Sequence, residues 1–152
     1  MRIINAESVA KCLPYSDLIE KLRAAFTHDT CAPERTNHTI KNTQDSASSL
    51  LLMPAWKQEE SIGIKIVSVF PENTANNLSA VHANYILMSA KDGIPKAVMD
   101  GSELTLRRTA CASALAADYL AKDHTKTLLM VCLLYTSPSP RDATLSRMPS
   151  SA

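Results

Sequence analysis

The sequence predicts an α/β fold of an α+β-like kind, in which several strands and a few helices share one hydrophobic core. Residues 62–70 carry the strongest strand pattern, because apolar side chains occupy both alternating faces of the segment. Residues 82–90 and 96–99 are expected to form two strands joined by a hairpin-type turn at residues 91–93. Residues 102–120 are rich in alanine, which predicts one long helix.

The remaining segments of the chain show weaker secondary-structure patterns. Pro14 to Asp17 begin a helix whose apolar stripe ends near Thr27, and Asp100 caps the long helix. The remaining expected segments are a strand at 2–5, a loop-rich region at 28–48, a strand at 49–53 closed by Pro54, a turn at 57–61, a loop at 71–77 and a last strand beginning at 127–131. Residues 132–152 are rich in serine and proline, which predicts a disordered tail.

Composition excludes several classes of protein. The chain has 152 residues, 45% of them hydrophobic and 20% charged, which suits one ordinary globular domain. A net charge of +1 without charged blocks indicates neither nucleic acid nor an anionic membrane as partner. No apolar run approaches the ~20 residues that a bilayer span needs. The four cysteines form no Cys-x-x-Cys pair and the histidines lack metal-ligand spacing, so we expect free thiols, a cytoplasmic location and no metal site.

Lys65 is the most unusual residue, because it interrupts the apolar strand 62–70. One interpretation is a lysine on an edge strand that prevents aggregation. The other is a partly buried amine that binds a carboxylate or transfers a proton, since desolvation lowers the pKa of a lysine toward neutral pH.

Two neighbouring arginines of the long helix have different surroundings. Arg107 follows Glu103 by four residues, so a surface ion pair accounts for it. Arg108 shares an apolar stripe with Leu104 and Leu115 and lacks a local partner. It either extends along its stem toward water or holds an anion at an interface.

Two further polar residues have only weak local signals. Arg35 lies in a predicted loop, where an arginine is usually solvated. His82 begins a predicted strand, where a histidine is usually a satisfied surface or core residue.

Several motifs resemble one family in order and spacing. They are Pro-Glu-Arg-Thr at 33–36, the apolar run ending in Met-Pro-Ala at 50–55, Gly-Ile-Lys-Ile-Val-Ser-Val-Phe-Pro-Glu-Asn at 63–73, Leu-Ser-Ala-Val-His-Ala at 78–83 and the helix segment 100–117 that contains Arg-Arg-Thr-Ala. Together they resemble the ornithine cyclodeaminase/mu-crystallin family, over about residues 1–131.

The resemblance implies a two-domain protein. Residues 1–120 would form the mixed-sheet substrate-binding and dimerisation domain with its linking helix 102–120, and residues 121–131 would begin a Rossmann domain for NAD or NADP. Members act on small amino acids or cyclic imino acids by hydride transfer. Some convert ornithine to proline with release of ammonia, others reduce ketimines, and mu-crystallins bind thyroid hormone. The expected partners are therefore a small amino or imino acid and a second copy of the chain.

The resemblance also implies roles for individual residues. Arg35 is similar to the family arginine that binds the substrate carboxylate. Lys65 looks like the lysine that contacts substrate and handles protons. Arg108 and Thr109 look like the pair at the junction of substrate and cofactor phosphates, and His82 resembles a cofactor-binding histidine of mu-crystallins.

Two departures from the family pattern qualify these expectations. Ala80 stands where some cyclodeaminases have a cofactor-contacting threonine, which weakens a strict ornithine-to-proline assignment. The strand at 127–131 should be followed by a glycine-rich phosphate loop, but no glycine follows Gly101. The expectation is a fragment that ends before that loop, with a foreign tail at 132–152. An NAD(P)-dependent enzyme, a mu-crystallin-like binding protein and an inactive fragment all remain open.

Overall fold

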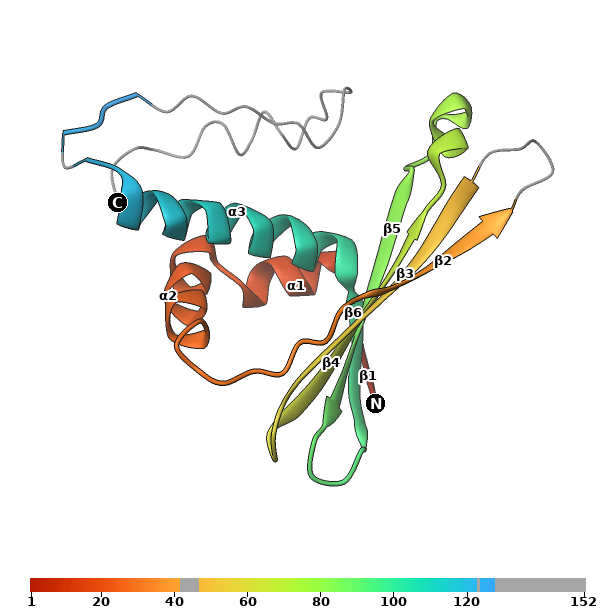
Figure 1. Cartoon of the computed structure of the whole chain (residues 1–152), viewed down its shortest axis with the longest axis horizontal. Coiled ribbons are helices and arrows are strands. Elements are labelled where there is room, and N and C mark those ends of the chain that lie inside the picture. Colours follow the sequence, from red (N-terminus) through yellow and green to blue (C-terminus); the bar gives the residue numbers. More distant parts are fainter. Residues whose placement is uncertain (42–46, 123, 128–152) are drawn as a thin grey trace.

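One open sheet organises the molecule. The computed structural model describes residues 1–41, 47–122 and 124–127. Within them, six strands form a mixed sheet in the order β1-β6-β5-β4-β3-β2, and helices lie on one side of it (Figure 1). The strands are β1 (Arg2–Ile4), β2 (Thr36–Lys41), β3 (Ala47–Lys57), β4 (Ser61–Val69), β5 (Val81–Ser89) and β6 (Pro95–Asp100). The helices are α1 (Ala6–Cys12), α2 (Tyr15–Ala25), the 3₁₀ helix η1 (Pro71–Asn76) and α3 (Gly101–Leu120).

The sheet is an antiparallel meander with one parallel addition. Strands β2 to β6 pair with their neighbours in chain order, and β1 pairs in parallel with β6. The mixed α/β architecture confirms the predicted fold class. β4 lies between β3 and β5, so Lys65 is on an interior strand. The edge-strand interpretation of Lys65 is therefore wrong, because the order of the strands could not be deduced from the local pattern.

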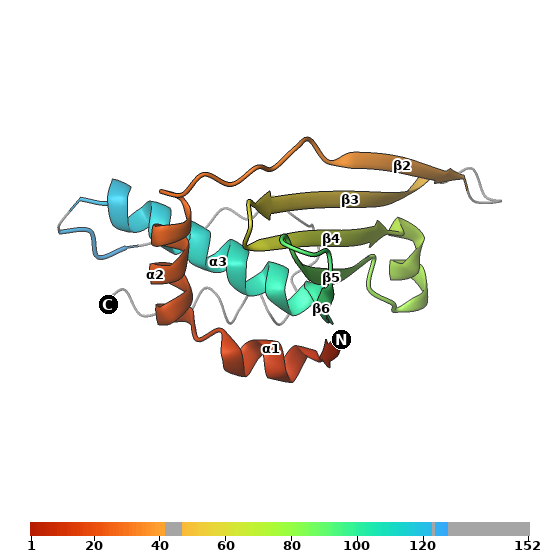
Figure 2. The same cartoon turned by 90° about the horizontal axis from the view of Figure 1, so that it is seen from below.

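Helix α3 starts in close contact with the sheet. The carboxylate of Asp100 accepts a hydrogen bond from the Glu103 amide at 2.7 Å and caps the helix. A Cβ added at Gly101 would lie 2.8 Å from backbone atoms of Ala83 and Asn84, so glycine permits this approach. From there α3 extends away from β5, with α1 and α2 packed beside it (Figure 2).

The buried core lies between the helices and one sheet face. Its apolar members are Val9, Leu18, Val67, Ala97, Cys111 and Leu115. Val67 and Lys65 lie two residues apart on β4, so they share the face that the helices cover. No described helix covers the opposite face, where Ile64 pairs with Ile86 and then Val98. The expectation that β4 is covered on both faces therefore holds for one face only within the described residues.

Several local expectations need correction. α1 was not predicted, β2 forms within the expected loop 28–48, and β3 continues through Pro54 to Lys57. The expected loop after β4 contains η1. The first strand, the helix after Pro14, the long helix and strands β4 to β6 are confirmed within a few residues. The expected strand at 127–131 lies outside the described residues beyond Thr127, as does the tail 132–152.

Candidate functional site

Lys65 is a half-buried cation on the helix-covered face of the sheet. Burial lowers the pKa of its amine below the ordinary value, and the positive charges of Arg108 and Arg35 lower that pKa further. Within the described residues, no carboxylate pairs with the Lys65 ammonium and no side chain hydrogen-bonds to it. Two other cations thus act on Lys65, and no carboxylate compensates them in this part of the chain.

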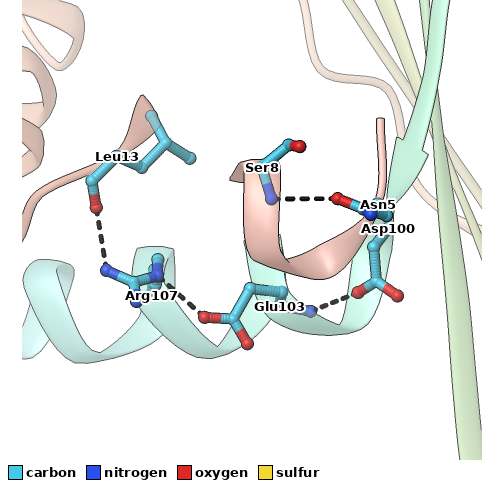
Figure 3. Close-up of polar contacts among 6 residues, drawn as sticks. All are labelled: Asn5, Ser8, Leu13, Asp100, Glu103 and Arg107. Atoms are coloured by element: carbon cyan, nitrogen blue, oxygen red, sulfur yellow. Dashed lines mark hydrogen bonds and ion pairs between the residues drawn. The ribbon is translucent and has the colours of Figure 1, made fainter. Parts of the chain in front are cut away.

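Arg107 is fixed by three interactions and has a structural role. Its Nε donates to the Glu103 carboxylate at 2.8 Å, with both side chains about one-seventh exposed (15% and 14%). Its Nη1 donates to the carbonyl oxygen of Leu13 at 3.0 Å (Figure 3). Its guanidinium lies 4.6 Å from the ring centre of Tyr15. Arg107 therefore connects α3 to the linker between α1 and α2. The predicted ion pair with Glu103 is confirmed, but it is largely buried and not at the surface.

Arg108, the next residue of α3, differs from Arg107 in its direction, its exposure and its contacts. Successive helical residues point about 100° apart, so Arg108 leaves the helix in another direction. It is exposed, and no carboxylate of the described chain pairs with it. Its charge nevertheless lowers the pKa of Lys65, so the two cations lie close enough for their charges to interact. The surroundings favour the anion-holding interpretation of this arginine.

Arg35 approaches Lys65 from the β2 edge of the sheet. It is exposed and directly precedes β2, the edge strand beside β3. Its charge also lowers the pKa of Lys65. In the sheet order only β3 separates β2 from β4, the strand of Lys65. The charges of Arg35 and Arg108, which come from segments distant in sequence, thus both act on Lys65. We call these three residues the cation cluster.

The cation cluster suits one kind of ligand. Three like charges without an anion repel one another, and a carboxylate placed among them would relieve that repulsion. Charge-assisted hydrogen bonds from guanidinium and ammonium groups also orient a carboxylate well. The arrangement can thus bind a small organic acid and place a readily released proton beside it.

Two other predicted residues are positioned differently. Thr109 is half-buried on α3, next to Arg108, where it could contact a ligand held by that arginine. His82 is exposed and pairs with Ser68, and strand alternation puts it on the opposite face from Lys65. The structure therefore does not bring His82 into the cation cluster.

Tyr85 was missed by the sequence reasoning. It is the register partner of Lys65 on β5 and shares the helix-covered face. Burial raises the pKa of its phenol. The available signal was the period of two along β5, but only the pairing with β4 makes Tyr85 a neighbour of Lys65.

Two surface hollows lie elsewhere. Trp56 and Gln58 contribute to both, near the turn between β3 and β4. Neither is lined by a member of the cation cluster. The candidate site is consequently defined by its charges and not by a deep hollow in this part of the chain.

The family of the chain follows from its similarity to known proteins. Residues 2–133 match the model of the ornithine cyclodeaminase/mu-crystallin family. The chain belongs to that family. It spans about 40% of the length of the curated relatives that it matches.

Three relatives of this family member are informative. The Delta(1)-pyrroline-2-carboxylate reductase of Colwellia psychrerythraea is 32% identical over 86% of this chain and 42% of its own length. The structure of the Thermococcus litoralis reductase of the same name, in complex with NADH and L-proline, is 31% identical with a TM-score of 0.69, covering 80% of this chain and 38% of that one. An archaeal alanine dehydrogenase dimer with bound NAD is 28% identical with a TM-score of 0.68, covering 80% and 38%.

No described helix of the chain is both long and apolar enough to cross a lipid bilayer.

Proposed function

We propose that the full-length protein is an NAD(P)-dependent oxidoreductase that reduces a small cyclic imino acid. The observation that carries this proposal is that the charges of Arg35 and Arg108 both act on half-buried Lys65, while no carboxylate pairs with any of the three in the described residues. Similarity to reductases of pyrroline-2-carboxylate supports the substrate class, since such a substrate presents one carboxylate and one imine. Deamination with cyclisation of a diamino acid would use the same contacts to the substrate carboxylate.

The two arginines and the lysine of the cation cluster have different roles in the proposed reaction, because a guanidinium and an amine differ chemically. A guanidinium is a fixed cation with a planar set of donors that matches a carboxylate, so Arg35 and Arg108 bind and orient the substrate carboxylate. Lys65 has a lowered pKa, so its ammonium releases a proton more readily than an ordinary lysine. It would donate that proton to the imine nitrogen while hydride adds to the imine carbon, which yields the cyclic amino acid and a neutral lysine.

The cofactor would bind mainly outside the described residues. A reduced nicotinamide supplies the hydride. Arg108 and Thr109 fit the edge of such a site, because an exposed arginine without a carboxylate partner suits a phosphate. The three glycines do not form a phosphate loop: Gly63 lies within β4, Gly93 turns the β5–β6 hairpin with φ +73°, and Gly101 begins α3. Residues 1–122 thus supply the substrate side of the proposed active site.

The uncovered sheet face is proposed to bind a second copy of the chain. Ile3 on β1 is 86% exposed, and it begins a cross-strand row with Val98, Ile86 and Ile64. An apolar face of this kind marks an interaction surface. The dimeric state of the similar alanine dehydrogenase supports a homodimer. Ile64→Lys should give monomers by size-exclusion chromatography with light scattering, and an unchanged dimer would contradict this interface.

A substrate panel on the full-length protein tests the proposed activity. NADH and NADPH oxidation is measured with pyrroline-2-carboxylate and with its six-membered homologue, and ammonia release is measured with ornithine and lysine. Lys65→Ala should lower turnover with dinucleotide affinity near normal, whereas Lys91→Ala in the exposed β5–β6 turn should leave both unchanged. Dinucleotide binding without turnover of any substrate would instead indicate a mu-crystallin-like binding protein.

A further inference from the structure

Tyr85 occupies a space that only a glycine leaves open. On the helix-covered face of the sheet, Tyr85 of β5 lies directly opposite Lys65 of β4. Its ring leans along β4 to Gly63, two residues from Lys65 on the same face. An ideal Cβ built at Gly63 would lie 1.8 Å from the phenol oxygen and 2.6 Å from the ring carbon Cζ. No side chain larger than hydrogen is compatible with this ring position.

The hydroxyl group of Tyr85 has no acceptor in the described chain. The residue is partly buried, and none of the described side chains or carbonyl groups hydrogen-bonds to its phenol. Burial raises the pKa of this phenol, so it remains a protonated donor at neutral pH. A partly buried donor of this kind usually has a partner, and the site beside it is one that suits a carboxylate.

We propose that Tyr85 is a substrate-contacting residue that sets the ring size of the imino acid accepted beside Lys65. Its hydroxyl donates a hydrogen bond to the substrate carboxylate, and its aromatic ring, seated on Gly63, limits the room next to the imine. This inference rests on the proposed reductase function and deepens it. The chemistry favours a five-membered cyclic imino acid over a six-membered one, because the larger ring needs the space that Tyr85 fills.

The size of the effect follows from pocket discrimination. One methylene in an apolar pocket changes kcat/KM by roughly 10-fold to 200-fold. Tyr85→Val removes both the ring and the hydroxyl, so it should shift the ratio of kcat/KM between the two ring sizes by about 10-fold toward the six-membered substrate. Tyr85→Phe removes only the hydroxyl. It should raise KM for both substrates several-fold while kcat and the ring-size ratio stay near those of the wild type.

A second pair of variants tests the contact with Gly63. Gly63→Ala should displace the phenol and lower kcat/KM, because the new Cβ meets the Tyr85 hydroxyl. In the Tyr85→Val background the same alanine has no phenol to displace, so its effect should be much smaller. An equal effect in both backgrounds would show that Gly63 and Tyr85 are not coupled and would count against the proposed ring position. Tyr119→Val on the exposed end of α3 serves as a control for loss of a tyrosine.

These measurements are made on the full-length protein, with the wild-type panel first. An enzyme that reduces cyclic imines, with an unchanged ring-size ratio in Tyr85→Val and an unchanged KM in Tyr85→Phe, overturns the assignment of Tyr85 alone. A wild-type protein that reduces no imine overturns the proposed function and this inference with it. Circular dichroism and dinucleotide binding of each variant establish that a kinetic change does not come from unfolding.

Discussion

The neighbouring residues Arg107 and Arg108 allow a stability role and a binding role to be separated by one substitution each. Arg107→Ala removes an ion pair to Glu103, a hydrogen bond to the Leu13 carbonyl and a ring contact with Tyr15. It also leaves the Glu103 carboxylate, which is only 14% exposed, without its cation. Arg108→Ala removes an exposed guanidinium that has no carboxylate partner in the described chain.

The expected loss for Arg107→Ala is large for a single side chain. A hydrogen bond from a charged donor contributes about 1.5–3 kcal/mol, and a cation–π contact about 0.5–2 kcal/mol. Breaking a largely buried ion pair by removing one partner costs about 3–5 kcal/mol, but these contributions overlap because one side chain makes all of them. We therefore expect the free energy of unfolding to fall by about 3 kcal/mol, and Tm to fall by about 10 °C for a domain of this size.

Urea unfolding of the 152-residue chain measures this loss with two probes. Far-ultraviolet circular dichroism follows the helices, and fluorescence of the single tryptophan, Trp56 on β3, follows the sheet. Arg108→Ala should change the free energy of unfolding by less than about 0.5 kcal/mol, as other exposed substitutions do. Equal effects of the two substitutions would refute the division of roles, since it depends on the contrast in their contacts.

Three further predictions concern other parts of the chain. Affinity for a carboxylate substrate should be highest below the lowered pKa of Lys65, and it should fall as pH rises through that pKa because the neutral amine no longer attracts the anion. The fall should begin below the ordinary lysine value of 10.5. Lys65→Arg should remove this pH dependence in a binding titration. Leu115→Ala should lower the free energy of unfolding by about 2–4 kcal/mol in urea, because Leu115 of α3 is a buried member of the core. Gly101→Ala should cost about 1–3 kcal/mol, because backbone atoms at 2.8 Å cannot move aside, and a neutral result in thermal unfolding would contradict the close approach of α3 to β5.

The elements that could be predicted from sequence are those with a long regular pattern. β4, the β5–β6 hairpin and α3 each have enough residues for the period of two or of 3.6 to be unambiguous. α1 has one buried residue, Val9, and depends on a cap in which Asn5 accepts a hydrogen bond from the Ser8 amide at 3.0 Å (Figure 3). β2 is exposed along its whole length and shows no alternation. Such short or edge elements are fixed by their neighbours and leave little trace in their own sequence.

Pro54 shows why a local rule failed. Proline lacks the amide hydrogen that a strand donates to its neighbour, so β3 was expected to end there. β2 pairs with β3 only as far as Leu52, opposite Thr36. Between Leu52 and Trp56, which forms an antiparallel bridge with Cys31, β3 has a partner only on the β4 side, where Pro54 lies opposite Ile64. Pro54 is therefore in a stretch where β3 is an edge strand, and proline is tolerated at such an edge.

The candidate site could be predicted only in part for a related reason. Lys65 was conspicuous because it interrupts an apolar strand, and the motif resemblance supplied roles for Arg35 and Arg108. Their proximity depends on the order of strands β2 to β5 and on the direction of α3, which are long-range properties. The same properties bring Tyr85 opposite Lys65 and leave His82 on the other face.

β4 is apolar on both faces for two different reasons. One face carries Gly63 and Val67 beside Lys65, and it is covered by the helices, so its composition follows from packing within this domain. The other face carries Ile62, Ile64 and Ile66, which no described helix covers. Burial of apolar surface stabilises a protein by about 25 cal/mol for each Å² removed from water, and a face left in water does not gain this stabilisation. The composition of that face is explained if it is buried after folding, as the proposed dimer requires.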